Sequence, residues 1–532
     1  MLSYVTFQKI RLFSRSHLVK KILISLLLTL SFLPTASPAQ KPAAAKAKTS
    51  AAAAKPQQSA YEIPIVTKTL ANGLEVIILA DSSIPLVTVE LAVRNGSFTE
   101  PPEYNGLSHL FEHMFFKDNL AVRLLQCENT PAINRFSPGY TAGCSEALSL
   151  KPQIGDISYL KYRNQLGFFN GTTREEVVNY FYNVTTPYLE AALRQVNDSV
   201  RFPAFDKTDF ENEKKVVIGE IDRQEANPYQ FLDLTMREKL FYKYPTRKIP
   251  IGTRQTVTAA TLDQMRLIQS RYYVPNNSAL IVTGDVKADE VFRLAEKIFG
   301  SWERRKVDPF KEFPLVEHPP LTKSEGIVIE KKTSDEGSED KGQNVFLEIG
   351  WHGPSIGKDD AATYAADVFS YIITQPDSRF QRNLVDSGIV ASANFGYYTQ
   401  RNIGPINLIM VTTPEKSKAA MKAAYAEIAN FTDPTYFSDE ELESAKTILE
   451  SNDLFSREKL SEYSHTLGFW WSSTGIDYYR GYYKNLRAVS RVEINKYLNN
   501  YVLGKPHVAI ALLSPGAKQK ANLTEQDLTG GK

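Results

Sequence analysis

The 532-residue sequence predicts an α+β fold made of two homologous α/β-sandwich halves joined by a linker. Three weak matches between the halves, which follow one another in the same order, indicate this duplication. The matching segments are residues 233–240 with 453–460, residues 213–220 with 443–450, and residues 273–274 with 501–502. The repeated unit of about 220 residues lies within the usual size range of a domain.

The N-terminal 60 residues are not expected to belong to the fold. Lys20 and Lys21 precede an apolar run and a small-residue cleavage site after Ala39, which is typical of a signal peptide over residues 1–39. Residues 1–21 lack acidic side chains and also fit a mitochondrial presequence, which would direct the chain to the matrix. The continuous apolar run favours export to the periplasm, and it is short for a membrane span, so we expect no stable span after its removal.

Residues 40–60 are rich in Ala, Lys and Pro and are expected to form a solvated tether. We expect the first domain over residues 61–302, with an irregular insertion at residues 118–167. The expected strands are residues 69–71, 74–79, 87–93, 177–182 and 278–283, and the expected helices are residues 107–116, 188–200, 210–223 and 288–299. Prolines and a charge run mark residues 303–325 as the linker, which leaves residues 326–517 as the second domain and 518–532 as a polar tail.

Composition excludes few classes of protein. The chain is 42% hydrophobic and 23% charged, with a net charge of +2, which favours neither nucleic acid nor a strongly acidic partner. Its two cysteines, Cys127 and Cys144, are too few for a disulfide scaffold. In an exported chain they can close a short loop. Metal ligation is the alternative, but no His or Cys companion stands at zinc-ribbon spacing.

The helix at residues 107–116 carries the chemistry. Its apolar residues recur at helical spacing, yet it also contains His109, Glu112 and His113. The two histidines are four positions apart, so both project from one face and can bind one tetrahedral metal. Glu112 is adjacent, where it can accept a proton from a metal-bound water. The alternative is a pair of core histidines satisfied by hydrogen bonds.

A catalytic zinc requires a third protein ligand and one open position. Glu213 and Glu220 are seven positions apart on a second helix, so they share one face. In the alternative reading both are surface glutamates among the cations Lys214, Lys215 and Arg223.

Together these motifs resemble the pitrilysin/insulinase family of zinc peptidases, and within it the mitochondrial-processing-peptidase-like branch of half-sized proteins. The resemblance covers about residues 69–514 and is far more specific than the five-residue motif alone. The matching segments are residues 109–113 (H-x-x-E-H), 170–173 (Asn-Gly-Thr-Thr for the family's Asn-Ala-x-Thr), 213–220, and the turn at 275–277 with Gly284-Asp285.

The resemblance implies that His109, His113 and Glu220 hold one Zn²⁺ per chain and that Glu112 is the general base. It implies that Glu213 supports a zinc ligand. It also places Phe169 and Asn170 on the edge strand where an extended peptide substrate pairs. The chain would then form half of a clamshell, closed by a homologous second subunit or by a second copy of itself.

Two departures from the family pattern bear on function. The spacing from His113 to Glu220 is long, and the excess lies in residues 118–167. Leu384 and Ala391 stand where active relatives carry an Arg and a Tyr that hold the substrate carbonyl, although Arg379 or Arg382 could substitute. We therefore expect a related chain to supply the Arg/Tyr pair.

The sequence thus predicts a zinc metalloendopeptidase that hydrolyses peptides or small unfolded polypeptides. The alternative is a non-catalytic scaffold or assembly subunit of the same fold. The intact H-x-x-E-H motif favours the peptidase, and Ala391 favours the scaffold.

Overall fold

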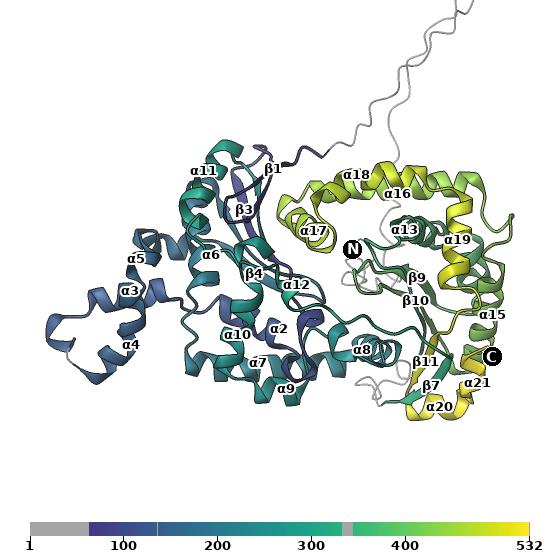
Figure 1. Ribbon diagram of the computed structural model, residues 1–532. Coiled ribbons are helices and arrows are strands. Elements are labelled where there is room, and N and C mark those ends of the chain that lie inside the picture. The colour runs from purple at the N-terminus through teal and green to yellow at the C-terminus, as the bar shows by residue number, and fades with distance from the viewer. Residues whose placement is uncertain (1–62, 136, 332–343, 531–532) are drawn as a thin grey trace, which may run out of the picture. The chain divides into compact units, whose positions relative to one another are not determined.

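The structure is a computed structural model that describes residues 63–530 except 136 and 332–343, so the predicted signal peptide and tether lie outside the described residues. Two mixed sheets dominate it (Figure 1). The first sheet, in the order β1-β2-β6-β3-β5-β4, comprises β1 (Val66–Thr69), β2 (Glu75–Ala80), β3 (Leu86–Val93), β4 (Phe168–Thr173), β5 (Val178–Thr185) and β6 (Ser278–Gly284). The second, in the order β7-β11-β8-β10-β9, comprises β7 (Glu325–Glu330), β8 (Val345–His352), β9 (Ser392–Tyr397), β10 (Pro405–Thr412) and β11 (Val508–Leu513).

The two sheets have the same topology once β1 is set aside. In each, the first and last strands along the chain pair in parallel, as β2 with β6 and β7 with β11. The other pairs are antiparallel and follow the same order, so that β4 and β9 occupy equivalent edges. The predicted α+β architecture with two homologous halves is therefore confirmed. We call the part with the first sheet the first half and the part with the second sheet the second half.

The equivalent helices show which matches between the halves are real. Glu213 and Glu220 lie on α7 (Lys207–Ala226), and their counterparts 230 positions later lie on α16 (Asp439–Arg457), which follows β10 as α7 follows β5. The match at 220 positions is wrong, because Asp233 and Arg237 lie on α8 (Pro228–Leu240) whereas residues 453–457 lie on α16. Both segments are amphipathic helix ends with an i,i+4 ion pair, a pattern that recurs by chance.

The predicted zinc helix is α2 (Leu107–Phe115), which contacts β4, β5 and α7. Phe111 stacks on Tyr273 at 4.0 Å between ring centroids, and Phe115 stacks on Tyr180 of β5 at 3.8 Å. These apolar contacts hold one face of α2 against the first sheet. The polar face is thereby directed at α7 and the end of β4.

Each half contributes one helix to one face of the other half's sheet. From the first half, α8 packs on β8 and β11, where Leu232, Met236 and Leu240 join the apolar cluster of the second sheet. From the second half, α17 (Leu460–Ser473) packs on β3 and β6, opposite the face that α2 covers. Figure 1 shows α17, drawn in yellow-green, beside the purple strand β3. The two halves are therefore interlocked by reciprocal helix packing.

Residues 118–167 are mostly helical, which corrects the prediction of an irregular segment. The helices are α3 (Leu120–Asn129), α4 (Pro138–Ser149), α5 (Lys151–Ile154) and the 3-10 segment η5 (Ser158–Gln165). Asn119 caps α3 and Ser137 caps α4, each accepting a backbone N–H with its side-chain oxygen. A disulfide joins Cys127 to Cys144, both of which are buried. Residues 120–157 lie between α2 and β4 in the sequence, and we call this segment the arm.

The C-terminal residues also differ from the expected polar tail. They form α20 (Pro515–Ala521) and α21 (Glu525–Leu528), and α21 packs on β7. The Leu528 side chain is fully buried, and its carbonyl accepts a hydrogen bond of 2.6 Å from the Tyr425 hydroxyl. A few apolar residues in a polar stretch are enough to fix these short helices on the sheet.

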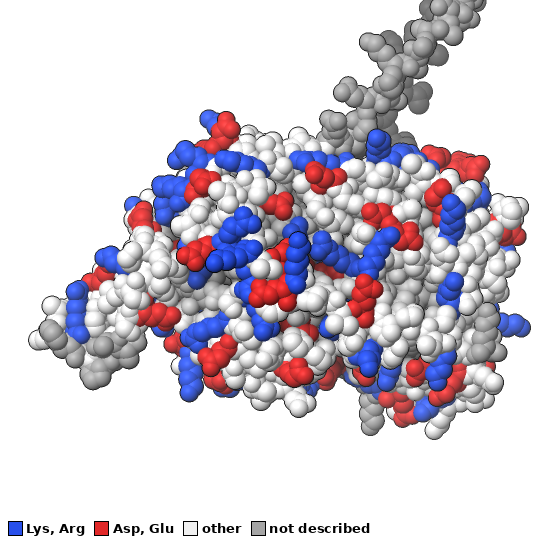
Figure 2. Space-filling model, viewed as in Figure 1, with Lys and Arg blue, Asp and Glu red and all other residues white. Residues whose placement is uncertain are grey.

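The other helices complete the layers around the two sheets. Those of the first half are α6 (Leu189–Arg201), α9 (Arg254–Ala259), α10 (Leu262–Tyr272), α11 (Ala288–Phe299) and α12 (Pro309–Glu312). Those of the second half are α13 (Asp360–Thr374), α14 (Arg379–Gln381), α15 (Ser417–Asn430), α18 (Ile476–Ala488) and α19 (Arg491–Tyr501). Over the face shown in Figure 2, basic and acidic side chains are interspersed. Within the described residues, every helix is too short or too polar to cross a membrane.

Removal of the disulfide tests how the arm is stabilised. A cross-link that closes a loop of this length contributes roughly 3 kcal/mol in the chain-entropy model, or about a hundredfold in the population of the opened arm. Cys127→Ala combined with Cys144→Ala should therefore raise the rate of proteolytic cleavage between residues 130 and 157 by about this factor. Equal cleavage rates for the variant and the wild type would show that packing alone holds the arm.

Candidate metal centre

Two helices bring the three predicted metal ligands together. His109 and His113 project from α2, and Glu220 projects from α7. Glu220 Oε2 lies 3.5 Å from His109 Nε2 and 3.7 Å from His113 Nε2, and the three ligand atoms lie within 4.8 Å of one another. Ligand atoms about 2.0–2.1 Å from a tetrahedral zinc are roughly 3.4 Å apart, so the cluster is close to the size that zinc requires.

The charge states favour a metal. Burial, followed by the neighbouring His113, lowers the pKa of His109 to about 4, which leaves a neutral imidazole. The neighbouring His113 imidazole is the main cause that holds the pKa of Glu220 below its usual value. Two imidazole nitrogens and one carboxylate oxygen form a donor set that zinc accepts, so the residues fit the ion.

His113 is held from both sides by carboxylates of α7. Its Nδ1 lies 2.8 Å from Glu213 Oε2, which favours the tautomer with hydrogen on Nδ1 and a free lone pair on Nε2, toward Glu220. Burial alone would lower the pKa of His113, but Glu220 and Glu213 outweigh it and raise that pKa. Glu213 Oε1 in turn pairs with Lys117 Nζ at 2.5 Å. Glu213 thus orients a ligand without belonging to the ligand cluster.

The Glu112 side chain projects from α2 toward the C-terminal end of β4. Its Oε2 accepts a hydrogen bond of 2.6 Å from the Thr173 hydroxyl, and burial raises the pKa of the carboxyl to about 7. The Glu112 side chain packs directly against the β4 backbone, since a Cβ at Gly171 would lie 2.6 Å from Glu112 Cγ. A carboxylate with a pKa near neutrality can both accept and release a proton.

Phe169 and Asn170 lie on β4, whose exposed edge ends the first sheet. Successive side chains of a strand alternate, so Phe169, Gly171 and Thr173 share the face toward α2, and Asn170 points to the opposite face. Phe169 is 49% exposed and stacks on Phe116 at 5.2 Å. The two predicted substrate contacts therefore lie on opposite sides of the same edge.

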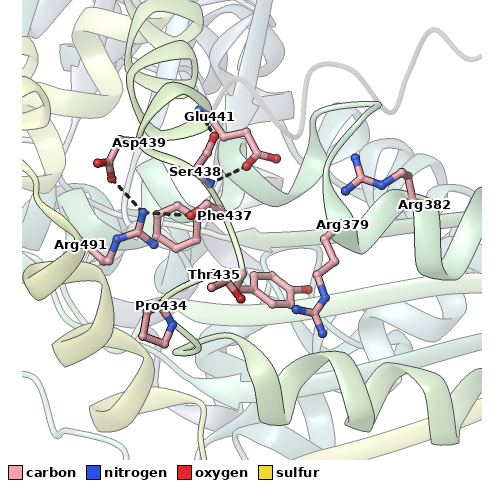
Figure 3. A pocket seen from close by; sticks show the side chains of 10 residues that line it. Arg379, Arg382, Pro434, Thr435, Phe437, Ser438, Asp439, Glu441 and Arg491 are labelled. Carbon is pink, nitrogen blue, oxygen red and sulfur yellow. Dashed lines mark hydrogen bonds and ion pairs between the residues drawn. The ribbon is translucent and has the colours of Figure 1, made fainter.

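The two residues that stand at the expected Arg and Tyr positions differ in burial. Leu384 is fully buried in the core of the second half, and Ala391 is exposed just before β9. Arg379 and Arg382 line a separate cavity of about 410 Å³ with Tyr436, Asp439 and Arg491 (Figure 3). Arg379 lies over the Tyr436 ring and Arg382 donates to the carbonyl of Asp377. None of the residues lining this cavity belongs to the His109 cluster.

Sequence reasoning gave no role to two residues of the site. Lys117 is four positions after His113, just past the C-terminal end of α2, a spacing that could have revealed it. Thr173 is on the same face of β4 as Gly171 and Phe169, but only the packing of β4 against α2 shows that it reaches Glu112.

Two family sequence models match the chain. The one described as insulinase, peptidase family M16, matches residues 75–126 and 158–253, and leaves most of the arm unmatched. The one described as the peptidase M16 inactive domain matches residues 259–449. The two matches together cover more than half of the chain and span both halves.

The similar proteins include several zinc proteases. The zinc protease YmxG of Bacillus subtilis is 25% identical over 237 residues, which are 44% of this chain and 50% of that protein. Human insulin-degrading enzyme is 27% identical over 257 residues, or 47% of this chain and 22% of that protein. The zinc protease PqqE of Helicobacter pylori is 23% identical over 340 residues, or 62% of this chain and 66% of that protein. The chain thus matches half or less of the length of the first two.

Solved structures share the fold. A protease from Helicobacter pylori superposes with a TM-score of 0.68 at 19% identity, covering 84% of this chain and 99% of that one. The periplasmic protease PqqL from Escherichia coli gives a TM-score of 0.63 at 16% identity, covering 88% of this chain but 49% of that one. The two family models and the zinc-protease relatives agree with the His109 cluster and with the duplicated sheets, and on these grounds the chain belongs to the insulinase family, peptidase family M16.

Proposed function

We propose that this chain is a zinc metalloendopeptidase that hydrolyses peptides or small unfolded polypeptides, with one Zn²⁺ held by His109, His113 and Glu220. The observation that carries the proposal is the convergence of these three ligand atoms within 4.8 Å. A carboxylate with a pKa near 7 and an exposed strand edge lie beside them. A scaffold protein requires neither of these features.

The side chains of the proposed site have separate roles in the reaction. Zinc, when bound, lowers the pKa of a coordinated water to about 7. Glu112 holds Oε2 in the hydrogen bond from Thr173, so Oε1 is the atom that takes up a proton and returns it to the leaving amine. Glu213 keeps the His113 imidazole in the orientation that directs Nε2 at the metal position.

Substrate binding falls to β4. This strand pairs with β5 on one side, and its other edge offers backbone N–H and C=O groups to an extended peptide. Phe168 and Phe169 are 61% and 49% exposed on the two faces of that edge. A segment that adds to the sheet in this way must be extended, which favours peptides and unfolded chains over folded proteins.

We propose that a related chain, or a second copy of this one, completes the site. With Leu384 buried and Ala391 too short to reach a substrate, neither expected position offers a group to the substrate carbonyl. PqqL is about twice as long as the part of it that this chain matches, so this chain corresponds to half of such a protein. A related chain would supply the Arg/Tyr pair across the clamshell, whereas a second copy of this chain, with the same Leu384 and Ala391, would only close the chamber.

The same reasoning favours an exported protein. The Cys127–Cys144 disulfide suits an oxidising compartment such as the periplasm. PqqL, which shares the fold, is described as periplasmic. Both features agree with the signal peptide predicted at residues 1–39.

Glu112→Gln tests the general base. It should lower kcat for a peptide substrate by about 10²–10⁴-fold because the amide cannot accept the proton. Zinc content, measured by atomic absorption, should stay at one per chain, and Glu211→Gln on the exposed face of α7 is the control that should keep wild-type kcat. An unchanged kcat in Glu112→Gln would favour the scaffold alternative.

Glu213→Gln tests the support of His113. The amide can still contact Nδ1, but it loses the charge that stabilises the oriented imidazole, so zinc affinity should fall by about 10–100-fold. Competition with a zinc chelator measures this change, again with Glu211→Gln as the control. Equal affinities in the two variants would assign Glu213 to α7 stability alone.

Purifying the chain by itself, and purifying it from its native host with any bound protein, tests whether it needs a partner. The lone monomeric chain should turn over slowly, and a complex with a related chain, or a homodimer detected by ultracentrifugation, should be the active species. Full activity from a monomer would rule out this division of labour.

A further inference from the structure

Glu112 is fixed by the last residues of β4, and the turn that follows is anchored in the second half. Thr173, the donor to Glu112, is the last residue of β4. Residues 174–177 then form the turn into β5, closed by a hydrogen bond of 2.9 Å from Arg174 N to the Val177 carbonyl. Arg174, the first residue of this turn, is bonded directly to Thr173, so a movement of the turn can displace Thr173.

Glu176 joins this turn to the second half. Its side chain is only 6% exposed, and its two carboxylate oxygens accept hydrogen bonds from Arg401 N at 2.8 Å and Asn402 N at 3.0 Å. Both N–H groups belong to residues 398–404, the loop that joins β9 to β10. We call this segment the 398–404 loop. A buried carboxylate that accepts two backbone N–H groups is a strong, geometrically specific contact.

Lys248 of the first half contacts the same loop mainly through the loop's backbone carbonyl groups. The Lys248 side chain is 2% exposed, and Nζ donates to the Gln400 side chain and to the carbonyls of Asn402 and Ile403. Ile403 has φ +53°, a left-handed conformation that β-branched residues rarely adopt. Such a conformation persists where the surroundings over-determine it, which indicates that the loop is held firmly.

The neighbouring Glu175 ties the turn to α8 as well. Glu175 pairs with Arg237 of α8, and Arg237 also donates to the Lys248 carbonyl at 3.0 Å. From the other side, Gly96 lies so close that a Cβ there would be 2.2 Å from the Arg174 carbonyl oxygen. The turn is therefore braced on both sides, with the second half contacting one of them.

We propose that the 398–404 loop of the second half is a positioning element for Glu112, which acts through Glu176, the 174–177 turn and Thr173. The half that lacks the zinc motif thereby sets the orientation of the general base in the half that has it. This inference rests on the proposed peptidase function for its kinetic consequence, but not for its structural one.

Glu176→Gln removes the charge and presents an amide NH₂ to two N–H groups. A small displacement of a catalytic group lowers turnover strongly, so kcat should fall about ten- to a hundredfold. KM and zinc content should not change. The matched control is Glu90→Gln, since Glu90 of β3 is also a fully buried carboxylate that contacts the second half, at 2.6 Å from both Ser464 Oγ and His465 Nδ1 of α17. Glu90→Gln should lower the melting temperature while kcat stays at the wild-type value.

A double-mutant cycle tests the route. Thr173→Val should lower kcat by a similar factor, and Glu176→Gln should cause no further loss in the Thr173→Val background because both act on the same hydrogen bond. Full additivity, or wild-type kcat in Glu176→Gln, would overturn the proposal while leaving the peptidase function intact.

Hydrogen exchange gives a readout that needs no turnover. Peptides that cover residues 168–177 should exchange about tenfold faster in Glu176→Gln than in the wild type, and at the wild-type rate in Glu90→Gln. Unchanged exchange in Glu176→Gln would refute the inference even if the chain proved to be no peptidase. Conversely, wild-type protein that binds zinc and does not cleave peptides, with or without a partner, would refute the proposed function only.

Discussion

The packing of α2 against α7 is the constraint on which the candidate metal centre depends. It places the His113 imidazole between Glu213 and Glu220, and every other distance in the cluster follows from that position. Two buried imidazoles in an apolar helix are costly to desolvate unless they have partners. The second helix supplies both partners, one for the ring nitrogen that orients His113 and one for the position of the metal. The apolar residues of α2 fix its rotation on the sheet, so the polar residues can face only α7 and β4.

The second half shows what the same scaffold does without the motif. Glu450 occupies on α16 the place that Glu220 occupies on α7, and it is buried whereas Glu220 is partly exposed. There the Arg487 guanidinium neutralises it, with Nε 2.8 Å from Oε1. The equivalent of α2 is α13, which contains no histidine. The carboxylate at this place on the helix therefore has an arginine partner in both halves, Arg487 for Glu450 and the more exposed Arg223 for Glu220 Oε1, and only Glu220 also faces two imidazoles.

The pairing of the two histidines and the duplication could be predicted because both depend on local spacing, whereas the choice of Glu220 over Glu213 as the expected third ligand came from the family resemblance. His109 and His113 share a helix face whatever the fold, and the 230-position match needs only that two helices be equivalent. Contacts across long distances could not be predicted. The exchange of α8 and α17 depends on one face of each sheet packing against a helix that lies far away in the sequence. The Thr173 contact depends on how β4 packs against α2. The arm was misjudged because its helices are short and begin at Asn, Ser or Pro, which also occur in loops. The 220-position match failed because amphipathic helices with ion pairs resemble one another.

The reciprocal packing of α8 and α17 also determines the order in which the chain can mature. The last strand of the first sheet, β6, ends at Gly284, but α17, which covers one face of that sheet, ends at Ser473, about 190 residues later. At synthesis rates of roughly 5–20 residues per second, that face stays without its covering helix for about 10–40 s. An exported chain must also emerge on the far side of a membrane before the two parts can meet. The nascent chain therefore carries one uncovered sheet face for tens of seconds, and Glu90, Asn179 and Thr283 on that face have no partner from α17 until the helix has been synthesised.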